Sequence, residues 1–66
     1  MKITGSEANK LGFIARYPDS EHSRALRDAL EGDAKEVAEA LVSGTLTGSD
    51  EVNSVVEALK PLNKKI

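Results

Sequence analysis

The sequence predicts an all-α protein, a compact bundle of three to four short helices at about residues 5–17, 20–31, 33–43 and 49–60. In each segment apolar residues recur every three or four positions, which is the spacing of one face of a helix. Residues that can cap a helix precede the segments, and glycine or proline follows them. The chain has 66 residues and no cysteine, so we expect a single small domain over 1–66 with a small core and no disulfide.

The first segment begins after Thr4, which can form a capping box with Glu7 three residues later. Ala8, Leu11 and Ala15 then share one helical face. Gly12 costs such a helix about 1 kcal/mol relative to alanine. A β-strand at residues 11–17, LGFIARY, is the local alternative to a helix, although this stretch has few of the β-branched residues that strands favour.

Pro18 separates the first segment from the second, because it disfavours helical geometry at the residue before it. Asp19 or Ser20 can cap the second helix. Its apolar stripe is expected to consist of Leu26, Ala29 and Leu30, with a half-buried His22 on the same side.

Gly32 and Asp33 lie between the second and third helical segments. The spacing of the apolar residues on either side fits two separate helices as well as one kinked helix. Glycine is the preferred residue just after a helix C-terminus. Asp33 is a good N-cap, and Glu36 stands three residues later, as a capping box requires. The local chemistry therefore favours two helices, with a continuous kinked helix as the alternative.

The last two segments are separated by SGTLTGS, residues 43–49, which is typical of a loop. Thr47 or Ser49 can cap the final helix, and Pro61 is expected to end it ahead of a short basic tail at 61–66. The apolar stripes of these two helices comprise Val37, Ala38, Leu41 and Val42, and then Val52, Val55, Val56 and Leu59.

Charge is unevenly distributed along the chain. Residues 1–27 carry five basic and three acidic side chains, 28–57 carry one basic and eight acidic, and 58–66 carry three basic, which gives +2, −7 and +3 and a sum of −2. Such charges usually coat solvated helix faces. An acidic central block can also steer a basic partner toward the protein.

The residue types argue against an enzyme, a metal site and a bound cofactor. His22 is the only histidine and lacks a usefully placed nucleophile or acid, since neighbours in sequence on a helix do not face one another. The glycine-containing stretches lack the lysine of a phosphate-binding loop. No apolar run resembles a membrane span or a signal peptide. We therefore expect a cytoplasmic location.

These observations favour a small non-enzymatic protein–protein interaction module, of the inhibitor, antitoxin or adaptor type. Its partner would be another protein, for which a basic surface is suitable, and a homodimer is the alternative left open. Phe13 and Tyr17 either supply the bulk of the core or protrude as an aromatic anchor. The residues that we expect to bind the partner are Phe13, Tyr17, Glu36, Glu39, Asp50 and Glu51.

The alternative function is a dimeric DNA-binding regulator with a helix-turn-helix-like unit built from the helices at 33–43 and 49–60. The second of these would enter the DNA groove, yet it has no basic residue before Lys60. Phosphate contacts dominate DNA affinity, so the acids there disfavour binding to nucleic acid.

One stretch, SRALRDALEGDAKEVAEALVSG at residues 23–44, resembles the C-terminal region of flagellar anti-sigma factors. In that family an arginine-led helix, a glycine and an alanine-rich helix follow one another. The family's short motif of tyrosine, valine and aspartate after the glycine is missing from this chain. The resemblance therefore carries no functional residue over to it.

Overall fold

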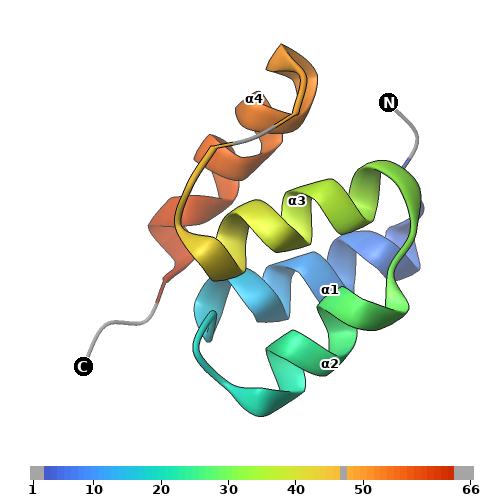
Figure 1. Cartoon of the computed structure of the whole chain (residues 1–66), viewed down its shortest axis with the longest axis vertical. Helices are drawn as coiled ribbons and strands as arrows, with labels where there is room; N and C mark the ends of the chain where they lie inside the picture. Colours follow the sequence, from blue (N-terminus) through green and yellow to red (C-terminus); the bar gives the residue numbers. More distant parts are fainter. Residues whose placement is uncertain (1–2, 47, 64–66) are drawn as a thin grey trace.

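The computed structural model describes residues 3–46 and 48–63, and helices joined by short loops are the regular secondary structure of this part of the chain. Four α-helices follow one another, α1 (Gly5–Arg16), α2 (Glu21–Ala29), α3 (Gly32–Ser43) and α4 (Asp50–Leu59), and a 3₁₀ turn, η1 (Lys60–Leu62), follows α4 (Figure 1). The all-α prediction is confirmed. Residues 11–16 are helical rather than extended, and Tyr17 is the C-cap of α1 instead of its last residue.

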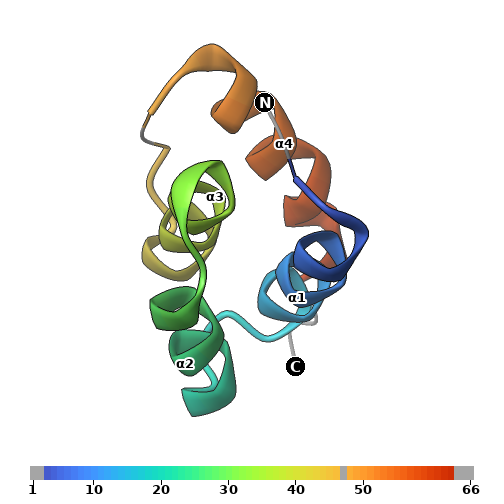
Figure 2. The ribbon, with the colours of Figure 1, turned by 90° about the vertical axis from the view of Figure 1, so that its right-hand side faces the viewer.

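Helix α3 lies at the centre of the bundle and packs against α1, α2 and α4. The turn η1 packs against α1, so the C-terminal end of the described chain lies beside the first helix. Figure 2 shows α2 and α3 along one side of the molecule and α1 and α4 along the other. The largest fully buried hydrophobic side chains come from three helices and are Leu11, Ile14, Val37, Val52 and Val56.

Side-chain caps begin three of the four helices, as the sequence predicts. Thr4 accepts a hydrogen bond from the backbone N–H of Glu7 at 3.2 Å, and the Glu7 carboxylate accepts one from the Thr4 N–H at 3.0 Å. The Ser20 and Ser49 hydroxyls cap α2 and α4 by accepting from the backbone N–H groups of Ser23 and Val52, without the reciprocal carboxylate bond. These bonds satisfy N–H groups that have no partner within their helix.

The break between α2 and α3 is confirmed, but the predicted cap at Asp33 is wrong. Leu30 and Glu31 are extended and Gly32 has a φ of +64°. Helix α3 starts at Gly32, so Asp33 already lies in its first turn, and α3 has no side-chain cap hydrogen bond. Glycine is required here because it adopts positive φ without a Cβ clash.

The buried face of α2 also differs from the prediction. Leu30 is buried and Leu26 half-buried, whereas Ala29 and His22 are exposed. The fully buried residue of α2 is Ser23. Its hydroxyl donates a hydrogen bond of 2.6 Å to the backbone carbonyl of Tyr17, which brings the first turn of α2 against the C-terminal end of α1. A hydroxyl with a backbone partner can be buried at little cost.

Replacing Ser23 with alanine should destabilise the protein by about 1 kcal/mol, because a buried hydrogen bond is lost. The Tyr17 carbonyl keeps a second bond, from the Ser20 N–H at 3.1 Å, which limits the loss. Urea unfolding would measure the difference. Ser54→Ala on the exposed side of α4 is the matched control and should be neutral or slightly stabilising. Equal stability of the two variants would show that the Ser23 bond contributes nothing.

The loop between α3 and α4 begins at Gly44, a left-handed C-cap with a φ of +76°. Thr47, one of the two predicted caps of α4, lies outside the described residues, as do residues 64–66 of the expected basic tail. Helix α4 ends at Leu59, and Pro61 is part of η1. Within the described ranges, none of the helices combines the length and the apolar character needed to cross a membrane.

Candidate partner-binding site

Three rings gather where the C-terminal end of α1 meets the first turn of α2. Phe13 and Tyr17 lie one turn apart, with ring centroids 5.1 Å apart and planes inclined at 51°. The His22 ring stands edge-on to Phe13, at 4.9 Å and 87°. Both arrangements fall within the range that aromatic pairs prefer. We call Phe13, Tyr17 and His22 the aromatic cluster.

The aromatic cluster does not supply the bulk of the core. Phe13 is half-buried, and Tyr17 is 43% exposed, the largest exposed fraction among the big hydrophobic side chains at 3–46 and 48–63. The fully buried hydrophobic side chains are aliphatic. The sequence allows Phe13 and Tyr17 to be either core residues or an exposed anchor. In the structure Tyr17 is exposed, with Phe13 and His22 beside it. Binding of a partner there stays a prediction.

The four predicted acidic residues lie on the other pair of helices. Glu36 and Glu39 are exposed on neighbouring turns of α3, and Asp50 and Glu51 are exposed in the first turn of α4. The Glu36 carboxyl carbon lies 3.7 Å from the position that a Cβ at Gly48 would take, so Glu36 lies beside the segment leading into α4. The structure brings Glu36 toward α4, but it places the acids and the aromatic cluster on different helices.

Asp50 and Glu51 also have a structural role. They lie at the N-terminal end of α4, where the helix dipole is positive. An acid in this position stabilises a helix by about 0.3–1 kcal/mol. Glu36 and Glu39 have no such position at the end of a helix, so they are the stronger candidates for contact with a basic partner.

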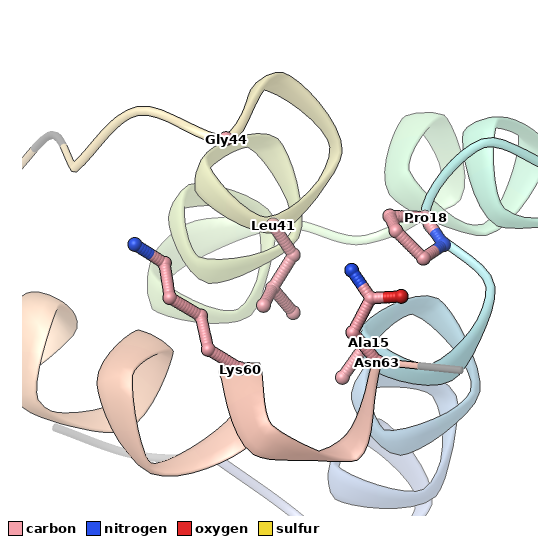
Figure 3. Close-up of a pocket in the computed structure, with 6 residues that line it drawn as sticks. All are labelled: Ala15, Pro18, Leu41, Gly44, Lys60 and Asn63. Atoms are coloured by element: carbon pink, nitrogen blue, oxygen red, sulfur yellow. The ribbon is translucent and has the colours of Figure 1, made fainter. Parts of the chain in front are cut away.

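A pocket of about 230 Å³, which the sequence does not reveal, is lined by residues of α1, α3 and η1. Figure 3 shows Leu41 pointing from α3 toward Ala15, with Lys60 on one side and Asn63 and Pro18 on the other. The remaining lining residue is Gly44. The pocket joins residues from distant parts of the chain and so has no signature in the sequence.

Among residues 3–46 and 48–63, no group of three or more histidine, cysteine or acidic side chains is placed to hold a metal ion. The arrangement of these residues offers two contact surfaces, the aromatic cluster at the junction of α1 and α2 and the carboxylates on α3 and α4.

Comparison of the chain with protein-family models, with curated sequences and with solved structures found no match. The resemblance of residues 23–44 to flagellar anti-sigma factors is thus a local similarity of helix, glycine and helix. The structure places these residues in α2 and α3, with the break at Leu30–Gly32.

Proposed function

We propose that this protein is a non-enzymatic interaction module that binds a partner protein, with the aromatic cluster as the anchor. The observation that supports this most is the exposed Tyr17 ring, which lies tilted against Phe13, and Phe13 in turn contacts His22. Aromatic residues dominate the energetics of protein interfaces. Rings already held by neighbours lose little conformational freedom on binding, so such an anchor is pre-organised.

The acidic residues of α3 are the second part of the proposed surface. Glu36 and Glu39 are exposed on the same side of the helix. Charges of one sign on a surface raise the rate at which an oppositely charged partner associates. The partner would therefore present an apolar recess for Tyr17 and basic residues for α3.

Capture of partners from a host lysate by the tagged protein, with and without nuclease, tests this proposal. Tyr17→Ala should reduce recovery of a stoichiometric partner at least about tenfold, because loss of an anchor residue costs more than about 1.4 kcal/mol of binding free energy. Leu46→Ala is the matched control, since Leu46 is 41% exposed and lies in the α3–α4 loop. A partner that both variants retain equally would contradict the role of the aromatic cluster.

Charge reversal tests the acidic surface separately. Glu36→Lys combined with Glu39→Lys should slow association with the captured partner, with a larger effect at low ionic strength, because screening weakens interactions between exposed charges. Asp50 and Glu51 are best changed to asparagine and glutamine, to limit harm to α4. Association kinetics at two salt concentrations would measure the effect. Unchanged rates at both would remove the electrostatic part of the proposal.

The DNA-binding alternative has no specific observation in its favour. Residues 44–49 connect α3 to α4, a longer link than the three- to four-residue turn of a helix-turn-helix unit. The exposed charges of α4 before Lys60 are Asp50, Glu51 and Glu57. Recovery of partners that disappears on nuclease treatment would nevertheless favour this alternative over protein docking.

A further inference from the structure

The pocket at η1 has an apolar floor and a polar rim. Ala15 and Leu41 are buried, at 2% and 8% exposed, and Pro18 is half-buried beside them. Lys60 and Asn63 are exposed and supply the polar side chains, on either side of Leu41 (Figure 3). The lining contains no acidic residue.

Both polar side chains of the rim are available to a ligand. Within the described residues, the Lys60 ammonium has no ion pair and the Asn63 side-chain amide has no hydrogen bond; Asn63 uses only its backbone N–H, toward the Lys60 carbonyl at 3.0 Å. An ammonium group only donates hydrogen bonds, whereas a side-chain amide both donates and accepts. The rim therefore offers a cation at one side and an amide at the other.

From this arrangement we propose that the pocket binds the end of an acylated amino acid that has an apolar side chain. The free carboxylate contacts the Lys60 ammonium, the apolar side chain covers Leu41 and Ala15, and the ligand's amide meets the Asn63 side chain. A volume of about 230 Å³ is below the roughly 300–1,000 Å³ of sites for drug-sized ligands, which suits a single residue. The site includes no residue of the aromatic cluster and is independent of the proposed protein docking.

Lys60 also has a structural role that the experiment must separate from binding. It directly follows α4 and lines the same pocket as Gly44, the C-cap of α3. A cation is favourable near the negative C-terminal ends of helices. Replacing Lys60 can therefore lower stability without any effect on a ligand, so binding and stability need separate readouts.

Titration of the ¹⁵N-labelled full chain with N-acetyl-leucine, followed by nuclear magnetic resonance, is the direct test. Saturable shifts are expected at the Gly44 and Asn63 amides and not at Gly5, at the far end of α1. N-acetylleucinamide, which lacks the carboxylate, should bind about two- to fivefold more weakly, the range expected for an exposed ion pair. N-acetylglycine, which lacks the apolar side chain, should bind about three- to tenfold more weakly.

Two lysine variants assign the carboxylate contact. Lys60→Gln should lower the affinity for N-acetyl-leucine to that of the parent protein for N-acetylleucinamide. Lys10→Gln makes the same charge change on an exposed residue of α1 and should leave the affinity for N-acetyl-leucine unchanged. The unfolding midpoint of each variant, measured without ligand, separates binding from stability. The proposal is overturned if N-acetyl-leucine causes no saturable shift or if N-acetylleucinamide binds as tightly as N-acetyl-leucine. It is also overturned if Lys60→Gln and Lys10→Gln bind N-acetyl-leucine with equal affinity.

The same chemistry occurs in a free acyl amino acid and at the C-terminus of a polypeptide. A five-residue peptide that ends in leucine with a free carboxylate, and its amidated form, distinguish these two sources. Tighter binding of the free-carboxylate peptide than of N-acetyl-leucine identifies a chain end as the ligand. Binding of N-acetyl-leucine alone identifies a small molecule.

Discussion

Ile14→Ala is expected to remove most of the stability of this protein. Ile14 is 0% exposed and belongs to the cluster of buried side chains from α1, α3 and α4. Truncation of a buried isoleucine costs about 2–5 kcal/mol, because apolar contacts are lost and a cavity remains. A protein of 66 residues has a free energy of unfolding of roughly 3–10 kcal/mol in total. The variant should thus be partly unfolded at room temperature or melt far below the parent.

Thermal unfolding followed by far-ultraviolet circular dichroism measures this effect. Ile14→Val is the graded control and should cost about 0.5–1.5 kcal/mol, which lowers the melting temperature by about 4–8 °C for each kcal/mol in a domain of this size. If Ile14→Ala melts within a few degrees of Ile14→Val, the packing around α1 is looser than the structure shows.

Ala38→Leu is expected to have the second-largest effect, through excess volume. Ala34, Ala38 and Ala40 are each at most 1% exposed on α3, the helix that the other three surround. Alanine at these positions lets neighbouring helices approach closely. Insertion of a larger side chain into a well-packed core forces neighbours from their preferred conformations, at a cost of about 1–3 kcal/mol.

Glu39→Leu is the control for this substitution, since it introduces the same side chain at the next, exposed position. Exposed substitutions usually change stability by less than about 0.5 kcal/mol. Urea unfolding of both variants should show a loss at position 38 alone. Equal stability of the two would mean that α3 is not closely packed at Ala38.

The sequence predicts the helices well because their ends are encoded locally. The caps at Thr4, Ser20 and Ser49 each depend on a residue and its partner three positions later, which periodicity and capping rules detect. Asp33 fails because Gly32, at positive φ, is already the first residue of α3, whereas a capping box at Asp33 would start the helix at Ala34. The backbone angle of one glycine decides this boundary.

Burial is harder to predict where a polar group faces another part of the backbone. Hydrophobicity places Ala29 of α2 inside and gives no reason to bury Ser23, yet Ala29 is exposed and Ser23 is 0% exposed. Its partner is the Tyr17 carbonyl, six residues away across a turn. The pocket at η1 also leaves no signal in the sequence, because its lining residues come from α1, α3 and η1, which are far apart in the chain. Phe13 and Tyr17 were identifiable as candidates, but only the packing shows which ring is exposed.

The hydrogen bond from Ser23 has a consequence for how the protein can evolve. It holds residue 17 by the backbone carbonyl, and the exposed ring takes no part in it. The hydrogen bond therefore does not depend on which side chain is displayed at that position. Natural selection or an engineer can exchange the displayed group, and with it the choice of partner, without rebuilding the bundle beneath.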